Sequence, residues 1–238
     1  GSYIAMEFSL NTMFYASSFT ALLSVLVLFG MKETLPSTTK FKPKMLLIHP
    51  KDILEPLVWQ PSLIMLLTVY SFGTVLTVTP DLSDHLEIGN RGLFFTVTLL
   101  ASVVVRLFSG KASDKFGRIK VLMVGVCMLL AAMIVLGFAS TPFIMYIGAI
   151  LFGVSAGINS PTIFAWTVDL ADEKTRGKGM STMFIALELG IILGSVFGAE
   201  LYDNDPEQFK YAFWFAATLA ALGFFYLLRL LSYNRSKN

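Results

Sequence analysis

The eleven residues Gly110–Lys120 carry four cations, one carboxylate and two glycines between two long apolar runs. Each residue type has a use at such a turn. Asp114 can accept hydrogen bonds from the free amides at a neighbouring helix N-terminus, where the helix dipole favours an anion. Gly117 permits a sharp reversal of the chain, and Gly110 lets a helix end approach a neighbour closely. Because a carboxylate at a helix end can make its contacts in one arrangement of two bundles and lose them in another, the segment predicts a conformational latch.

Glu188 is a second chemical candidate, because it lies inside an apolar run. It is about eight residues into that run, roughly 12 Å along a helix, which places it near a bilayer midplane. A charged carboxylate there is costly, so we expect it to be protonated, paired or facing water. Low polarity favours the neutral form, which suits a group that binds and releases a proton. The alternative is a structural, protonated glutamate bonded to a neighbouring helix.

Glycines recur every four residues in two of the apolar runs: Gly153 and Gly157, then Gly190, Gly194 and Gly198. Such stripes let helices touch backbone to backbone, so helix packing is their predicted role. Asn159 and Ser160 precede Pro161, whose missing amide frees a carbonyl nearby. A polar group beside an interrupted helix is a typical place for a substrate contact.

The elements that must position these residues follow from composition. Apolar residues make up 55% of the chain and charged residues only 14%, against about 25% in soluble domains, and the mean hydropathy is +0.70. A helix needs about 20 apolar residues to cross a bilayer, and lipid-exposed backbone is satisfied only in helices and closed barrels. The apolar runs do not alternate as barrel strands do, so we predict seven membrane-spanning helices: Thr12–Gly30, Leu57–Thr79, Gly92–Ser109, Val121–Ala139, Phe143–Val168, Ser181–Leu201 and Tyr211–Leu231.

The cations predict the orientation. One set of connections holds sixteen lysines and arginines and the other holds two, Arg91 and Lys210. The rich set belongs in the cytoplasm, which puts the C-terminus inside and Gly1 outside. An external N-terminus without a targeting segment favours the view that earlier helices are absent from this chain. Arg106 is expected to snorkel to the cytoplasmic surface, or to pair with Asp114 or with a carboxylate on the absent part.

The pattern Gly-x-x-x-Asp-Lys-x-Gly-Arg, from Gly110 to Arg118, resembles the signature loop of the major facilitator superfamily, which lies between the second and third helices of each six-helix half. Ile119 departs from it, because a cation is common there, and this puts part of the loop's contacts in doubt. Three weaker segments agree. KETLP at Lys32–Pro36 resembles the end of the last N-terminal helix. DEKTRGKG at Asp172–Gly179 resembles the Arg-Gly loop after the fourth helix of a half. ELGIILGSVFG at Glu188–Gly198 resembles the glycine-rich fifth helix of drug-efflux members.

The resemblance implies an all-α polytopic membrane protein. Residues 1–30 would end the N-terminal half, 31–56 would be a cytoplasmic linker, 57–232 the C-terminal six-helix bundle of two inverted three-helix repeats, and 233–238 a cytoplasmic tail. Family members are secondary transporters in which two bundles rock about a central site. The missing N-terminal half would therefore be the main partner, beside the lipid bilayer, a small-molecule substrate and protons.

The resemblance also implies roles for individual residues. Those near the cytoplasmic loops would gate the transporter: Gly110, Asp114, Lys115, Gly117, Arg118, Arg106 and Arg176. The first and fourth helices of each half line the cavity in this family, which makes four residues candidate substrate contacts: Tyr70, Thr74, Asn159 and Trp166. For each of these four, hydrogen bonding between helices is the alternative. Glu188 would couple transport to protons or recognise a cation.

We therefore expect a proton-coupled efflux transporter of a small solute in a bacterial inner membrane. The alternatives are a transport-inactive scaffold or sensor paralogue and a seven-helix receptor. The last run has neither a lysine for a retinal nor an Asn-Pro pair, which argues against the receptor. The sequence has no nucleophile–base set, phosphate loop or metal-ligand spacing, and His49 and His85 fall in opposite loops. Neither an enzyme nor a cofactor is expected, and a net charge of +2 does not suggest nucleic acid.

Overall fold

The computed structural model describes residues 4, 7–30, 53–203 and 205–235. The predicted KETLP end at Lys32–Pro36 and nearly all of the predicted linker fall outside these residues, as do the lysines between the first two apolar runs. The chain divides into two compact units, Gly1–His49 and Pro50–Asn238. The first unit contains helix α2, Leu10–Leu28, whose N-cap Ser9 accepts a hydrogen bond from the Thr12 amide at 3.1 Å.

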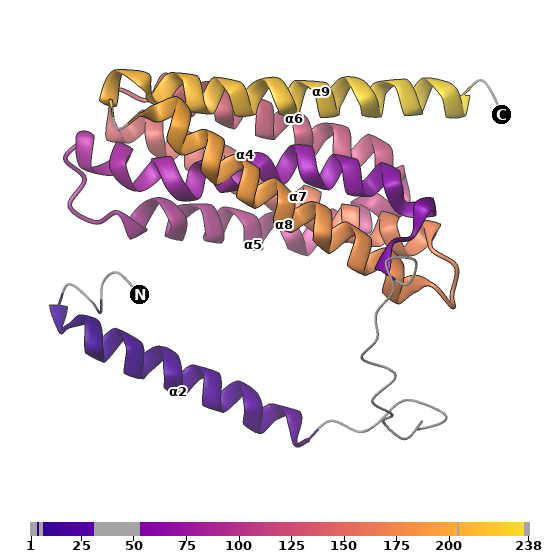
Figure 1. Ribbon diagram of the computed structural model, residues 1–238, viewed down its shortest axis with the longest axis horizontal. Helices are drawn as coiled ribbons and strands as arrows, with labels where there is room; N and C mark the ends of the chain where they lie inside the picture. The colour runs from indigo at the N-terminus through magenta and orange to yellow at the C-terminus, as the bar shows by residue number, and fades with distance from the viewer. Residues whose placement is uncertain (1–3, 5–6, 31–52, 204, 236–238) are drawn as a thin grey trace. The chain divides into compact units, whose positions relative to one another are not determined.

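The second unit is a bundle of long helices that run in alternating directions (Figure 1). They are α4 (Trp59–His85), α5 (Gly92–Phe116), α6 (Arg118–Gly137), α7 (Pro142–Leu170), α8 (Arg176–Tyr202) and α9 (Phe209–Arg235), with short 3-10 turns η2 (Pro56–Val58) and η3 (Pro206–Gln208) before α4 and α9. No strand occurs within the described ranges. Including α2, seven helices in the described part of the chain are long and apolar enough to cross a membrane, which confirms the predicted all-helical class.

Several helices continue beyond the ends that hydropathy predicts, and α4 and α5 do so furthest. α4 passes through Pro80 and ends at His85, and α5 continues through the charged segment to Phe116. Hydropathy reports where hydrocarbon ends, whereas a helix can continue in the headgroup region because its backbone bonds are internal. The reversal between α5 and α6 therefore occupies only Gly117, at φ 91° and ψ 144°, a conformation that favours glycine.

Gly110 consequently lies within α5 and not at its end. It is exposed, and a Cβ built there would meet nothing within 4 Å among the residues that the structure describes. The close approach predicted for Gly110 is therefore wrong for this part of the chain.

Packing within the bundle relates two groups of three helices, α4–α6 and α7–α9. The most extensive contact is between α4 and α8, and its counterpart after exchange of the two groups is that between α7 and α5. The same exchange relates the contact between α4 and α9 to the contact between α7 and α6. The contact between α6 and α9 corresponds to itself. Because each group has three helices, the second group runs opposite to the first, as predicted for inverted repeats.

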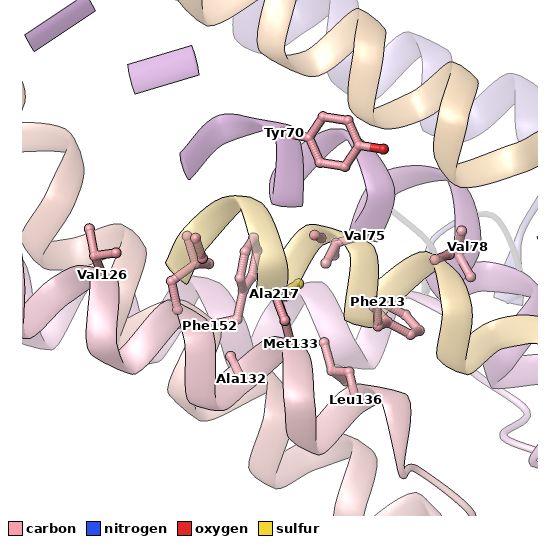
Figure 2. Close-up of a cluster of buried hydrophobic side chains, with 14 of the residues drawn as sticks. Tyr70, Val75, Val78, Val126, Ala132, Met133, Leu136, Phe152, Phe213 and Ala217 are labelled. Carbon is pink, nitrogen blue, oxygen red and sulfur yellow. The ribbon is translucent and has the colours of Figure 1, made fainter. Parts of the chain in front are cut away.

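The core lies where α4, α6, α7 and α9 meet. Figure 2 shows Val75 and Val78 of α4 close to Phe213 of α9, with Met133 and Leu136 of α6 beneath them, and all five side chains are buried. Since lipid tails are as apolar as these side chains, the cluster is stabilised by close packing more than by removal from water.

Glycines and hydroxyl groups join α4 to α8. A Cβ at Gly190 would lie 2.8 Å from the Leu66 carbonyl oxygen, and Gly194 is similarly close to the backbone of Tyr70. At this close approach Thr74 Oγ1 donates to the Gly194 carbonyl at 3.2 Å. Gly198 continues the stripe, with its Cβ position 3.2 Å from the Cα of Thr74.

The counterpart contact between α7 and α5 uses the same chemistry. Gly153 lies against the Thr98 carbonyl, and a Cβ at Gly157 would lie 2.6 Å from the Ser102 carbonyl oxygen. Ser109 Oγ donates to the Gly157 carbonyl at 2.9 Å. That carbonyl is the one left without an amide partner by Pro161, four residues later in α7. The freed carbonyl predicted from the sequence thus joins two helices.

Candidate gating network and substrate cavity

Three helix ends meet at one end of the bundle, where α5 stops, α6 starts and α7 stops. Arg118 Nε donates to Asp169 Oδ2 at 2.8 Å, and Arg118 Nη1 pairs with Asp114 and contacts Ser113 Oγ at 2.5 Å. The Arg118 side chain is 21% exposed, while those of Asp114 and Asp169 are 67% and 51% exposed. One sheltered guanidinium therefore holds two accessible carboxylates, and we call these three residues the gating network.

The three charges of the gating network all oppose the dipoles of their own helices. Arg118 is at the start of α6, where a helix dipole disfavours a cation, and both aspartates are near helix ends that disfavour anions. Each mismatch costs about 0.3–1 kcal/mol, similar to what an exposed ion pair contributes. The network therefore stabilises this arrangement only slightly, which is the property that a reversible contact requires.

Sequence reasoning identified two members of the network and missed the third. It expected helix amides as partners of Asp114, whereas the structure pairs Asp114 with Arg118. Asp169 was not among the predicted residues, because it falls one residue beyond the fifth apolar run, which ends at Val168, whereas α7 continues to Leu170. The alternation of helix directions was the available signal, because it puts the end of that run beside the Gly110–Lys120 segment.

The remaining loop candidates lie at the same end of the bundle. Lys115 Nζ lies over the Phe116 ring, 5.4 Å from its centroid. Arg176 begins α8 and is exposed. Neither cation has a recorded bond to the gating network among the described residues.

A cavity of about 280 Å³ lies among α4, α7 and α8, with contributions from α5 and α6. Its wall on α4 is the stripe Met65, Thr68, Val69 and Phe72, at helical spacing. Most of the remaining lining is apolar, and its polar members are Arg106, Ser155, Asn159 and Ser160. An apolar pocket with a few converging polar groups is the common form of a small-molecule site.

Of the four predicted cavity residues, the structure places Asn159 in this cavity. Tyr70 is buried against Phe215 of α9, with ring centroids 5.7 Å apart, and Thr74 bonds to α8. Both lie on the α4 face that meets the glycine stripe, next to the face that lines the cavity. Trp166 lies in a separate hollow of about 290 Å³ beside the Gly117 turn. The prediction chose polar or aromatic residues by the helix that carries them and did not consider which face of the helix they occupy. This explains why three of the four lie outside the cavity.

Glu188 is exposed on α8 and does not line the cavity, although its neighbours Leu187 and Ile191 do. The glycine stripe explains this placement, because Gly190 and Gly194 face α4 and turn Glu188 toward the outside of the α4–α9 bundle. Within the described bundle, the carboxylate is therefore on an outer face.

Arg106 lies ten residues before the end of α5 and three before the end of its apolar run at Ser109, and it is exposed. Snorkelling from this position stays a prediction. Asp114 pairs with Arg118 and not with Arg106. Arg106 also lines the cavity.

A family model confirms the resemblance on which the sequence prediction rested. The model for the Major Facilitator Superfamily matches residues 61–238, well over half of the chain. The chain belongs to this superfamily. It is thereby an integral membrane protein of a transporter family.

Relatives are numerous, and the first of them are 26–29% identical to the chain over the aligned regions. It is 29% identical over 155 residues to Multidrug resistance protein 1 of Bacillus subtilis, covering 63% of this chain and 39% of that protein. It is 27% identical over 156 residues to the proton-coupled antiporter flippase LtaA of Staphylococcus saprophyticus, covering 64% and 38%. The chain thus spans about two-fifths of the length of these curated relatives.

A solved structure shows the same fold. The chain superposes on the crystal structure of the human organic anion transporter MFSD10 (TETRAN) with a TM-score of 0.60 at 22% identity, over 76% of this chain and 47% of that one. At that identity the likeness concerns the arrangement of helices alone.

Proposed function

We propose that α4–α9 form one half of a secondary active transporter that exports a small solute in exchange for protons by alternating access. A second six-helix bundle, the N-terminal half expected from the sequence, would supply the other wall of the substrate site. The membrane would be a bacterial inner membrane, with the gating network and the C-terminus on the cytoplasmic side. The names of the relatives, multidrug resistance proteins and a proton-coupled antiporter, support export and proton coupling.

The gating network is the observation that carries the proposal. Its two carboxylates are accessible and bound to one arginine by bonds of small net energy. Two conformations of a transporter must differ by only a few kcal/mol, so contacts of this strength can shift their populations. Asp114 could exchange Arg118 for groups of a second bundle as the two halves tilt. Because the turn is a single residue, Gly117 would make α5 and α6 move together. Lys115 and Arg176 would add positive charge at the end of the bundle where Asp114 changes partner.

Glu188 is the candidate for proton coupling within this proposal. A carboxylate facing lipid at mid-helix is costly, so its outward position fits a water-lined path or a contact with the second bundle. We expect Glu188→Gln, in the complete gene product, to lose proton flux driven by substrate while retaining exchange of substrate for substrate. Glu200→Gln is the matched control, because Glu200 is exposed near the end of the same helix. An unchanged pH dependence in Glu188→Gln would remove the coupling role.

The transport proposal itself is tested in proteoliposomes that hold the complete gene product and a pH-sensitive dye. With an imposed proton gradient, adding amphipathic ions from a panel of both charges should dissipate the gradient for at least one ion. An uncoupler should abolish accumulation of that ion. Proteoliposomes that respond to no ion, with protein that is folded by circular dichroism, would favour the scaffold alternative.

A further inference from the structure

Arg106 is an exposed cation of α5 that also lines the cavity. α5 runs from Gly92 to Phe116, so Arg106 is fourteen residues after its start and ten before its end, within about one turn of the helix midpoint. The residues that follow, Leu107 and Phe108, are exposed and apolar, as expected of hydrocarbon depth. An ionisable residue that borders hydrocarbon is expensive and usually serves a function.

The cavity offers Arg106 no negative charge. Its lining contains no aspartate or glutamate, and across residues 53–203 and 205–235 no carboxylate is recorded within ion-pair distance of the guanidinium. A cation in apolar surroundings is stabilised strongly by an anion that shares its site. The missing partner of Arg106 can therefore be the ligand of the cavity.

A hydroxyl donor lines the same cavity as the cation. Asn159 Nδ2 donates to Ser155 Oγ at 3.0 Å, and the hydroxyl hydrogen of Ser155 has no acceptor among the described residues. A hydroxyl that already accepts a bond donates the next one more strongly. Because Gly157 of α7 packs against Ser102 and Val105 of α5, the backbone of Arg106 is level with Asn159, about one helical turn from Ser155. All three line the cavity.

The rest of the lining is suited to an apolar body. The Phe72 and Phe152 rings lie nearly parallel, 16° apart with centroids separated by 6.3 Å, and Met65 and Ile163 are also in the wall. The volume of about 280 Å³ is at the lower end for small-molecule sites. A compact aromatic or branched apolar body of low molecular mass fits it.

We propose that the cavity selects a small organic anion with one carboxylate or sulfonate head, and that Arg106 is the residue that determines this charge preference. The head would lie between the Arg106 guanidinium, which can donate two parallel hydrogen bonds, and the Ser155 hydroxyl. The apolar body would lie along Phe72 and Phe152. This inference rests on the proposed function, because it names the substrate class of the same transporter.

Two permanently charged probes of nearly equal shape test the proposal: naphthalene-2-sulfonate and naphthalen-2-yl-trimethylammonium. Binding of each, in radiolabelled form, is measured by equilibrium dialysis with the purified complete gene product. We expect the sulfonate to bind at least tenfold more tightly than the ammonium. Arg106→Gln should weaken sulfonate binding tenfold or more, Arg106→Lys less, and Ser155→Ala a few-fold. Arg106→Glu should reverse the preference between the probes.

The matched control is Arg229→Gln, which removes an exposed cation of α9 outside the cavity and should leave binding unchanged. Each variant is first checked for a monodisperse size-exclusion profile, and Arg106→Lys keeps the test open if Arg106→Gln does not fold. Binding of neither probe, a preference for the ammonium, or equal losses in the Arg106 and Arg229 variants would each overturn the proposal.

The outcomes separate this inference from the transport proposal. Proton-driven transport of a cation, with no Arg106-dependent sulfonate binding, would overturn anion selection and leave transport standing. Sulfonate binding that depends on Arg106, in a protein that moves no ion under a proton gradient, would support the inference and overturn transport.

Discussion

Replacing Gly157 by alanine tests how closely the bundle is packed. The new Cβ would lie 2.6 Å from the Ser102 carbonyl oxygen, so α5 and α7 must separate by about 0.8 Å to reach an ordinary contact of about 3.4 Å. The same movement stretches the 2.9 Å bond from Ser109 Oγ to the Gly157 carbonyl to about 3.7 Å, beyond hydrogen-bond range. That carbonyl has no other partner, because Pro161 lacks the amide that would normally reach it.

The cost follows from these two effects and one opposing gain. Overpacking costs about 1–3 kcal/mol, an unpaired buried carbonyl costs about 1–3 kcal/mol, and alanine gains about 1 kcal/mol over glycine within a helix. Gly157→Ala should therefore lower the free energy of unfolding by about 3 kcal/mol. The measurement is an SDS titration of the complete gene product in mixed micelles, followed by far-ultraviolet circular dichroism.

Gly223→Ala is the matched control, because its Cβ would make only ordinary contacts at 3.8 Å with Ile64 and Leu67. It should be neutral or slightly stabilising. Ser109→Ala should cost about 1–2 kcal/mol alone and almost nothing in the Gly157→Ala background, because the bond is already lost there. Equal stability of Gly157→Ala and Gly223→Ala would refute the argument from close packing.

Two further variants test other parts of the bundle. Asp169→Asn should change unfolding free energy by less than about 1 kcal/mol yet alter the rate of solute exchange at least several-fold, because the gating network is weak but joins three helices; a stability loss with unchanged exchange kinetics would make it a structural bridge only. Tyr70→Phe should leave the unfolding midpoint unchanged or raise it, since the Tyr70 hydroxyl is buried without a recorded hydrogen-bond partner, and a clear fall in the midpoint would mean that the hydroxyl has a partner.

Much of the fold could be predicted because lipid restricts the choices. A run of about 20 apolar residues in a bilayer is a helix, and the distribution of lysine and arginine predicts which ends share a side. The ends of the helices were harder to predict, because hydropathy records the thickness of hydrocarbon and not the length of a helix. The error of seven residues at the end of α5 misled the interpretation of Gly110.

The candidate site was harder to predict because it depends on facing directions. Asn159 could be found because Pro161 marks an interruption in its helix. Tyr70 and Trp166 have suitable chemistry but lie on faces turned to other helices, which a single sequence does not reveal. Asp169 needed the pairing of α7 with the α5–α6 turn, a contact between residues about fifty positions apart in the chain.

The pairing of α4 with α8 has a consequence for biosynthesis. About ninety residues separate the end of α4 at His85 from the start of α8 at Arg176. At a synthesis rate of about 5–20 residues per second, α4 waits roughly 5–20 seconds for its main neighbour. During that interval its Thr74 hydroxyl and the exposed backbone beside Gly73 face lipid or the insertion machinery. Newly made α4 is therefore a natural client for a membrane chaperone that shelters polar helix faces until translation is complete.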